Sequence, residues 1–212
     1  MKFKFKIQQY QTDAVENTVA VFTGQPSHGM AVYRIDPGKR EKNFFDEEDY
    51  TGYRNHQLEL DSPTLLKNIN AIQNLYDITP SSTLAKGVGA VNLDIEMETG
   101  TGKTYVYIKT MFELHKQYGW SKFIIVVPSI AIREGVAKSI KMLEEHFMEY
   151  YGRKARWFIY NSSNLQQLDS FSSDSGLCAM IINTQAFAAS MKEGGRSKAV
   201  SYTHLRAHET EL

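Results

Sequence analysis

Hydrophobic residues in the first third of the chain recur at helical spacing over two segments. Residues 11–22 carry a broad apolar face that predicts one amphipathic helix, and residues 65–76 carry a second such face. Ser62 followed by Pro63 predicts the start of the second helix, because serine caps helices and proline is tolerated at the first helical position.

Residues 24–60 separate the two predicted helices and differ from them in composition. They are polar, interrupted by glycine and proline, and most strongly charged between Lys39 and Asp49. Such a stretch is typical of a surface insertion. One short strand is expected within it, near Met30–Ile35.

After residue 90, apolar runs of strand length alternate with segments of helical periodicity. The predicted strands span residues 91–95, 123–127, 157–160 and 177–182, and the predicted helices span residues 105–118 and 136–150. The run at 123–127 is rich in β-branched residues, as expected for a parallel strand buried on both faces. The alternation predicts an α/β fold, a parallel sheet flanked by helices. The serines at 162–163 and 170–175 predict loops.

The composition excludes several classes of protein. With 24 basic and 24 acidic residues the formal net charge is zero, so contact with nucleic acid would need a local basic patch. No run is long enough to span a bilayer, and the first residues lack the apolar core of a signal peptide. Cys178, the single cysteine, is expected to be a small buried hydrophobe. The lack of a disulfide suits the reducing cytoplasm, where we expect the protein to act.

The strongest chemical signal is the octet at residues 97–104, Met-Glu-Thr-Gly-Thr-Gly-Lys-Thr. Its position between a predicted strand and a predicted helix is typical of a phosphate-binding loop. Lys103 would reach the β- and γ-phosphates, and the Thr104 hydroxyl would hold Mg²⁺, so both are the expected catalytic residues. The backbone N–H groups that would turn toward the anion belong to Thr99, Gly100, Thr101 and Gly102.

One position departs from the general phosphate-loop pattern, which begins with glycine where this chain has Met97. The alternative interpretation is a glycine- and threonine-rich turn that only caps a helix. Turn chemistry alone does not require Gly-Lys-Thr between a strand and a helix, and the sequence therefore favours a nucleoside triphosphate site.

Two motifs together resemble those of superfamily 2 helicases and translocases. Thr-Gly-Thr-Gly-Lys-Thr after a strand resembles their first motif, and Tyr10-Gln11-x-x-Ala14-Val15 is similar to their glutamine motif. This resemblance implies that Gln11 reads the edge of adenine, since an amide offers both a donor and an acceptor. The alternative is an ordinary polar residue on the predicted helix.

Residues 123–136, Phe-Ile-Ile-Val-Val-Pro-Ser-Ile-Ala-Ile-Arg-Glu-Gly-Val, carry a more specific likeness. They are similar to the next helicase motif, and in detail to the restriction (Res) subunit of type III restriction–modification enzymes. Further stretches with the same likeness are Leu65–Ile69, Glu96–Thr99, Tyr105–Tyr107 and Phe112–Leu114. The resemblance covers residues 1–198, and Met97 is no anomaly within it.

The family resemblance implies an incomplete first RecA-like motor domain at residues 61–198, preceded by a glutamine-motif helix at 1–23. ATP and Mg²⁺ are the implied cofactors. The parent enzyme would be an ATP-dependent DNA translocase and endonuclease that acts on double-stranded DNA with a methyltransferase partner.

Three residues are implied to contact the DNA backbone. Ser129 and the amides after Pro128 would donate to a phosphate, and Arg133 would add a charge-assisted contact. Thr184 resembles a further backbone-contacting motif at a strand end. The alternatives are a salt bridge between Arg133 and Glu134 and a capping role for Thr184.

A helicase motor also needs an Asp-Glu pair at the end of a second strand, which holds Mg²⁺ and orients the attacking water. The best run, 177–182, is followed by Asn183-Thr184 instead. The family's order places the pair, the second motor domain and the nuclease further on. We therefore expect an N-terminal fragment that binds ATP weakly and does not hydrolyse it. Residues 199–212 resemble translated adapter read-through, with a divergent helix as the alternative.

Two other functions stay open at this point. One is a different superfamily 2 enzyme, such as a DNA-repair or RNA helicase, which the sequence after the motor would distinguish. The other is a non-catalytic ATP-binding module that uses nucleotide only as a switch.

Overall fold

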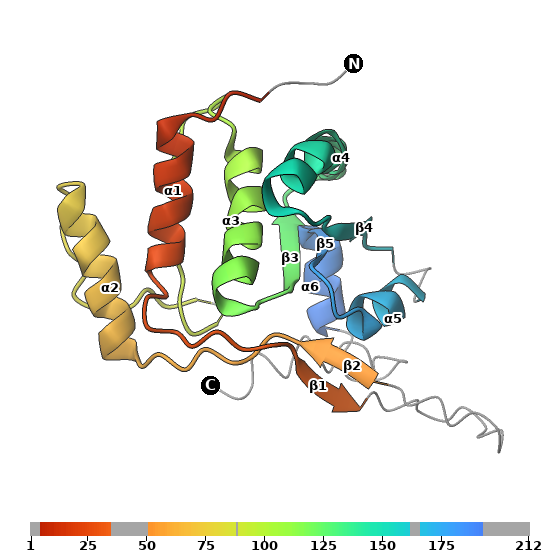
Figure 1. The fold of residues 1–212 in the computed structure, drawn as a ribbon, viewed down its shortest axis with the longest axis horizontal. Coiled ribbons are helices and arrows are strands. Elements are labelled where there is room, and N and C mark those ends of the chain that lie inside the picture. Colours follow the sequence, from red (N-terminus) through yellow and green to blue (C-terminus); the bar gives the residue numbers. More distant parts are fainter. Residues whose placement is uncertain (1–4, 35–50, 88, 162–165, 193–212) are drawn as a thin grey trace. The chain divides into compact units, whose positions relative to one another are not determined.

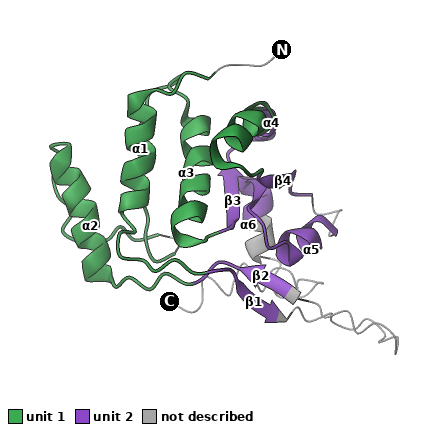
Figure 2. Cartoon of the chain, viewed as in Figure 1, with its two compact units in different colours: residues 1–28, 57–120, 139–154 green, residues 29–56, 121–138, 155–212 purple. Residues whose placement is uncertain are grey.

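The computed structural model describes residues 5–34, 51–87, 89–161 and 166–192. By their contacts the residues form two compact units, which Figure 2 colours separately. Unit 1 comprises residues 1–28, 57–120 and 139–154, and unit 2 comprises residues 29–56, 121–138 and 155–212. The predicted tail at 199–212 and the most charged part of the predicted insertion lie outside the described residues.

Unit 1 is helical within its described residues. Its helices are α1 (Gln9–Ala20), α2 (Ser62–Leu75), α3 (Lys103–Tyr118) and the last part of α4 (Ile130–Tyr151), shown in Figure 1. Val15 of α1, Leu65 of α2 and Val106 of α3 belong to one buried core. The Tyr118 hydroxyl donates to the Val19 carbonyl at 3.2 Å and ties α3 to α1. The helices predicted from residues 11–22, 65–76 and 105–118 are therefore confirmed, with small shifts of their ends.

Both ends of α2 differ from expectation. Asp61, and not Ser62, is the capping residue: its carboxylate accepts from the Thr64 N–H at 2.9 Å. This bonding to Thr64 lowers the pKa of Asp61, because it favours the ionised carboxylate at the positive end of the helix. Tyr76, predicted on the buried face, is 47 % exposed because the helix has already ended.

The strand predicted at residues 91–95 is wrong. These residues have no strand conformation, and no described strand pairs with them. Val91 and Leu93 instead pack against the helical core of unit 1 as an irregular segment. Alternating hydrophobic residues show only that one side of a segment is buried, whereas a strand also needs partners for its N–H and C=O groups.

Unit 2 contains a parallel sheet in the order β3–β5–β4, built from β3 (Lys122–Val127), β4 (Arg156–Ile159) and β5 (Cys178–Asn183). All six residues of β5 are buried, Cys178 included, and they pair with strands on both sides. Helix α6 (Thr184–Lys192) contacts β5 and β3. The predicted α/β class and parallel pairing are confirmed, and the arrangement is consistent with part of a RecA-like domain.

The prediction that residues 123–127 form a strand buried on both faces is wrong. In the described sheet β3 pairs only with β5, and Val126 on β3 is 42 % exposed. The strand that meets the expectation is β5. Sequence runs of this kind identify parallel strands but do not say which of them is central.

The predicted insertion contributes ordered structure at both of its ends. Strands β1 (Ala31–Arg34) and β2 (Thr51–Arg54) pair antiparallel, so the predicted short strand is confirmed and a second one was missed. Beyond β2, the Asn55 side chain accepts from the N–H groups of Ser121 and Lys122 at 2.7 and 2.9 Å. It also donates to the Lys122 carbonyl at 2.8 Å and so satisfies the backbone where β3 begins.

Helix α5 (Gln166–Ser173) occupies a segment predicted in part as loop. Leu168 is buried, and Phe171 packs against the same small core as Phe158 of β4. The Lys122 ammonium donates to the carbonyls of Phe171 and Asp174 at the end of this helix. Serine favours loops by weak local preference, and burial of two apolar residues outweighs that preference here.

Asn55→Ala should lower the free energy of unfolding by roughly 3 kcal/mol, because three partly buried hydrogen bonds are lost where β3 begins, beside the fully buried Ser121. Urea denaturation of the whole chain measures this. Asn74→Ala, at an exposed position near the end of α2, is the control and should change stability by less than about 0.5 kcal/mol. Equal effects of the two substitutions would contradict the role of Asn55.

Candidate functional site

The octet at 97–104 forms an open loop that runs directly into α3 in unit 1. Gly100 and Gly102 both have positive φ, +84° and +87°, a conformation that side-chain-bearing residues rarely adopt. Gly102 caps α3, so Lys103 and Thr104 are its first two residues. The first N–H groups of a helix lack partners within the helix, and they give this end of α3 the polarity of an anion site.

Two side chains of helix α1 bind the backbone of the loop. Gln11 Nε2 donates to the Thr101 carbonyl at 2.8 Å, and the Tyr10 hydroxyl donates to the same oxygen at 3.1 Å. On the other side of the turn, the Thr101 hydroxyl donates to the Glu98 carbonyl at 2.7 Å. The structure thus brings Gln11 to the loop. It also shows a contact of Tyr10 with the loop that no sequence motif predicts.

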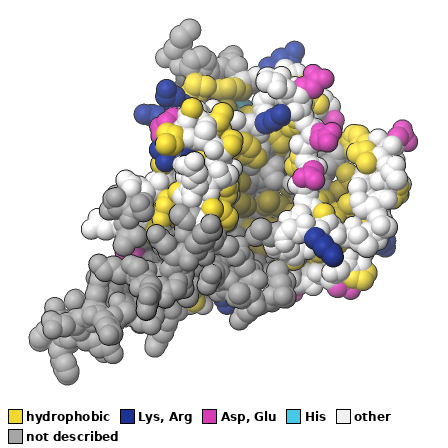
Figure 3. All heavy atoms as spheres, turned by 180° about the vertical axis from the view of Figure 1, so that it is seen from behind, with side chains coloured by type: hydrophobic (Ala, Val, Ile, Leu, Met, Phe, Trp, Pro, Cys, Tyr) yellow, Lys and Arg dark blue, Asp and Glu magenta, His cyan; other side chains and the backbone are white. Residues whose placement is uncertain are grey.

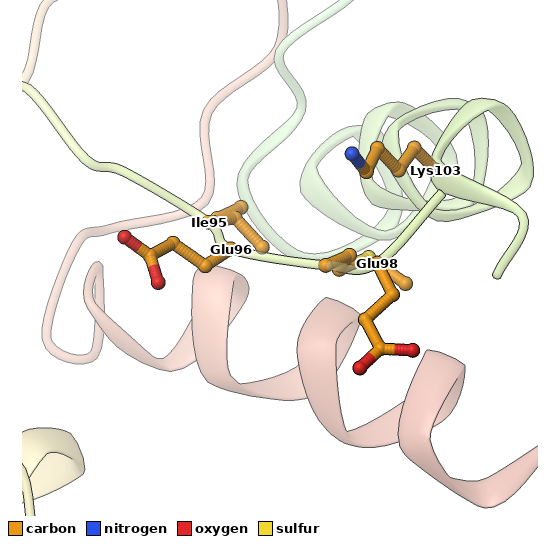
Figure 4. Close-up of a pocket in the computed structure, with 5 residues that line it drawn as sticks. Ile95, Glu96, Glu98 and Lys103 are labelled. Atoms are coloured by element: carbon orange, nitrogen blue, oxygen red, sulfur yellow. The ribbon is translucent and has the colours of Figure 1, made fainter. Parts of the chain in front are cut away.

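Lys103 borders an open hollow of about 550 Å³ that is also lined by Ile95, Glu96, Met97 and Glu98. Figure 4 shows the Lys103 ammonium extending from the first turn of α3. The carboxylates of Glu96 and Glu98 point in other directions, and no ion pair to Lys103 occurs within the described residues. An exposed cation beside a helix N-terminus is a suitable environment for phosphate.

Thr104 lies one turn of helix before Tyr107. Burial raises the pKa of the Tyr107 phenol, and the Thr104 side chain opposes this shift. The two hydroxyls are therefore close, although they do not meet hydrogen-bond geometry. Thr104 is partly exposed, and its hydroxyl oxygen has the lone pairs through which a side chain can coordinate Mg²⁺.

The remaining predicted site residues lie in unit 2, at the carboxyl ends of two paired strands. Val127 of β3 is opposite Asn183 of β5, so Ser129 and Thr184 follow at the same edge of the sheet. Ser129 caps α4 by accepting from the Ile132 N–H at 3.3 Å. Asn183 caps α6 by accepting from the Ala186 N–H at 3.0 Å, so the cap predicted for Thr184 belongs to its neighbour.

Arg133 sits on the first turn of α4, where its guanidinium lies 3.2 Å from the Glu134 carboxylate. This pair is the alternative that the sequence left open, and it is present in the structure. Glu134 is half exposed, so the pair is weak and can exchange for another anion. The geometry is therefore compatible with a phosphate contact by Arg133.

Charged side chains are interspersed by sign on the face seen in Figure 3. Within the described part of the chain there is no group of three or more His, Cys, Asp or Glu side chains placed to hold a metal ion. No helix among the described residues is long and apolar enough to cross a membrane.

A family model with the description "Type III restriction enzyme, res subunit" matches residues 4–202. The chain belongs to this family. The match spans the glutamine motif, the glycine loop and the strand–helix segment that begins at β3, which are the parts that carried the resemblance in the sequence.

Curated relatives agree with this assignment over parts of the chain. The chain is 39 % identical over 110 residues to the EcoP15I Res subunit of Escherichia coli, covering 51 % of the chain and 11 % of that protein. It is 38 % identical over 121 residues to the EcoPI Res subunit of Escherichia phage P1, covering 55 % and 12 %. For the StyLTI Res subunit of Salmonella typhimurium the identity is 52 % over 62 residues, covering 28 % and 6 %. The chain thus aligns with about a tenth of these relatives' length.

Two alanine substitutions in the loop should differ in their effect on stability. In Gly100→Ala the alanine would have to adopt a positive φ, but its Cβ would have no atom within 4 Å. In Gly102→Ala the Cβ would also lie 2.5 Å from Gln11 Nε2. We expect Gly100→Ala to lower the free energy of unfolding by about 1–2 kcal/mol. Gly102→Ala should lower it by about 1 kcal/mol more, because Gln11 must leave Thr101. Urea denaturation without nucleotide measures both, and equal losses would contradict the contribution of the Gln11 contact.

Proposed function

We propose that this chain supplies the phosphate- and adenine-binding part of the ATP site in the restriction subunit of a type III restriction–modification enzyme. The observation that carries the proposal is the glycine loop with two positive-φ residues, an exposed Lys103 at the start of α3, and Gln11 bonded to the loop backbone. Membership in the Res family supports the same conclusion.

The residues present fit ATP and Mg²⁺. Thr99, Gly100, Thr101 and Gly102 would offer backbone N–H groups to the phosphates, and Lys103 would add a charge-assisted contact. Thr104 would be the protein ligand of Mg²⁺, whose chemistry is to neutralise charge on the phosphate oxygens. Gln11 would read the adenine.

Double-stranded DNA is the proposed substrate of the second group of residues. Ser129, Arg133 and Thr184 lie at an edge where the N-termini of α4 and α6 follow adjacent strands. Helix N-termini and hydroxyls are common donors to DNA phosphates, which fix position without reading sequence. We further propose that the parent enzyme is an ATP-dependent translocase and endonuclease that works in the cytoplasm with a methyltransferase subunit.

Lys103→Ala should weaken binding of a fluorescent ATP analogue with Mg²⁺ by roughly ten- to a hundredfold, the range for losing a hydrogen bond to a charged group. Fluorescence anisotropy on the 212-residue chain measures this. Lys86→Ala, an exposed lysine of the same unit, is the matched control and should bind as the wild type does. An unchanged affinity in Lys103→Ala would overturn the phosphate site. ATP hydrolysis that is lost in this variant would show that the chain is more than a binding module.

Arg133→Ala should weaken binding to double-stranded DNA and reduce the salt dependence of that binding by about one counterion. The slope of log K against log salt concentration for a short duplex is the measurement. Arg54→Ala removes an exposed arginine of β2 in the same unit and should leave the slope unchanged. The same slope in Arg133→Ala as in wild type would mean that Arg133 serves only its pair with Glu134.

A further inference from the structure

The Thr101 carbonyl oxygen is the point at which two neighbouring side chains of α1 meet the glycine loop. Gln11 Nε2 donates to it at 2.8 Å and the Tyr10 hydroxyl at 3.1 Å. A carbonyl oxygen has two lone pairs, so these two donors use its full capacity. Both come from the first turn of α1, and the carbonyl is therefore held from one rigid element.

The bond to Thr101 fixes which way the Gln11 amide is turned. If the amide were rotated by half a turn, Oε1 would face the Thr101 oxygen, and a hydrogen bond would be replaced by repulsion between two acceptors. One orientation is therefore favoured. It leaves the second N–H and Oε1 of Gln11 without a hydrogen-bond partner among the described residues.

The groups left on Gln11 match adenine and not guanine. Along the N6/N7 edge adenine presents a donor and an acceptor, which a glutamine amide can bind with two hydrogen bonds. Guanine presents two acceptors, O6 and N7, along the same edge. With the amide fixed, Oε1 would oppose O6, whereas a freely rotating amide could turn its N–H groups toward guanine.

We propose that Tyr10 is a positioning residue: by sharing the Thr101 carbonyl it holds the loop backbone that orients the Gln11 amide, and so it sets the preference for adenine over guanine nucleotides. The inference rests on the proposed ATP site and adds a residue and a specificity to it. Tyr10 acts through its hydroxyl, and the residue is 48 % exposed and lies outside the buried core cluster of unit 1, so loss of the hydroxyl leaves that core intact.

Tyr10→Phe tests the proposal, since it keeps the ring and removes only the O–H. The dissociation constants of ATP and GTP, each with Mg²⁺, are measured on the 212-residue chain by competition against a fluorescent nucleotide. We expect the preference for ATP over GTP to fall by roughly three- to tenfold, the range for one neutral hydrogen bond. Tyr76→Phe, a 47 % exposed tyrosine at the end of α2, is the control and should keep the wild-type preference.

Gln11→Glu is a second variant with a distinct expectation. It keeps the length of the side chain but turns a donor into an acceptor against the Thr101 oxygen, so the adenine preference should be lost altogether. Thermal melting without nucleotide shows whether each variant folds. A variant that melts as the wild type does cannot owe its altered preference to unfolding.

The outcomes separate the inference from the function on which it rests. A wild-type chain that binds neither nucleotide overturns the proposed function and the inference with it. A wild-type chain that prefers ATP, with the same preference in Tyr10→Phe, overturns the role of Tyr10 alone. Equal weakening of ATP and GTP by Tyr10→Phe would also overturn it, because Tyr10 would then only support the phosphate loop.

Discussion

The hydrogen bonds that the Thr101 carbonyl accepts from α1 are the constraint on which the candidate nucleotide site depends. Thr101 lies between two glycines with positive φ, so its peptide cannot pair as it would in a helix or a strand. Tyr10 and Gln11 supply the missing donors from a helix 90 residues earlier in the chain. The loop is thereby attached to the first turn of α1, and α3 begins directly after the loop at Gly102.

Unit 2 depends on a comparable constraint, the full burial of β5. Its residues are buried, and its backbone pairs with β3 along the whole strand and with β4 over Cys178–Ile181, which sets the register of all three strands. Because the strands are parallel, β3 and β5 end at the same edge, and the helices that follow begin beside one another. The two caps, Ser129 and Asn183, keep those helix starts in place. A surface suited to phosphate therefore follows from strand pairing, although the chain as a whole carries no net charge.

Most of the helices and strands could be predicted from the sequence, because residues on the buried face of a helix recur at regular spacing and buried strands form continuous apolar runs. The faces of α1, α2 and α3 and the three sheet strands were all predicted within a few residues. The failures concern interactions between distant segments. The segment 91–95 alternates as a strand does, yet no described strand pairs with it. Helix α5 is made of residues that favour loops, and its burial against the sheet of unit 2 becomes visible only once the fold is known. Asn55 has no local signal at all, since its partners at 121 and 122 are far away in the chain.

The candidate site shows the same division between local and distant information. Local spacing is enough to predict a phosphate loop with Lys103 and Thr104, because such a loop is a continuous segment. Family resemblance was needed for Gln11, whose contact with Thr101 spans 90 residues. Tyr10 was missed, because a tyrosine beside a motif glutamine has many possible uses. Its hydroxyl shares one acceptor atom with Gln11, and that shared atom links the proposed base-reading side chain to the backbone of the glycine loop. In the proposed site a change at Gln11 that weakens its bond to Thr101 acts on the loop that leads to Lys103, which would couple recognition of the base to binding of the phosphates.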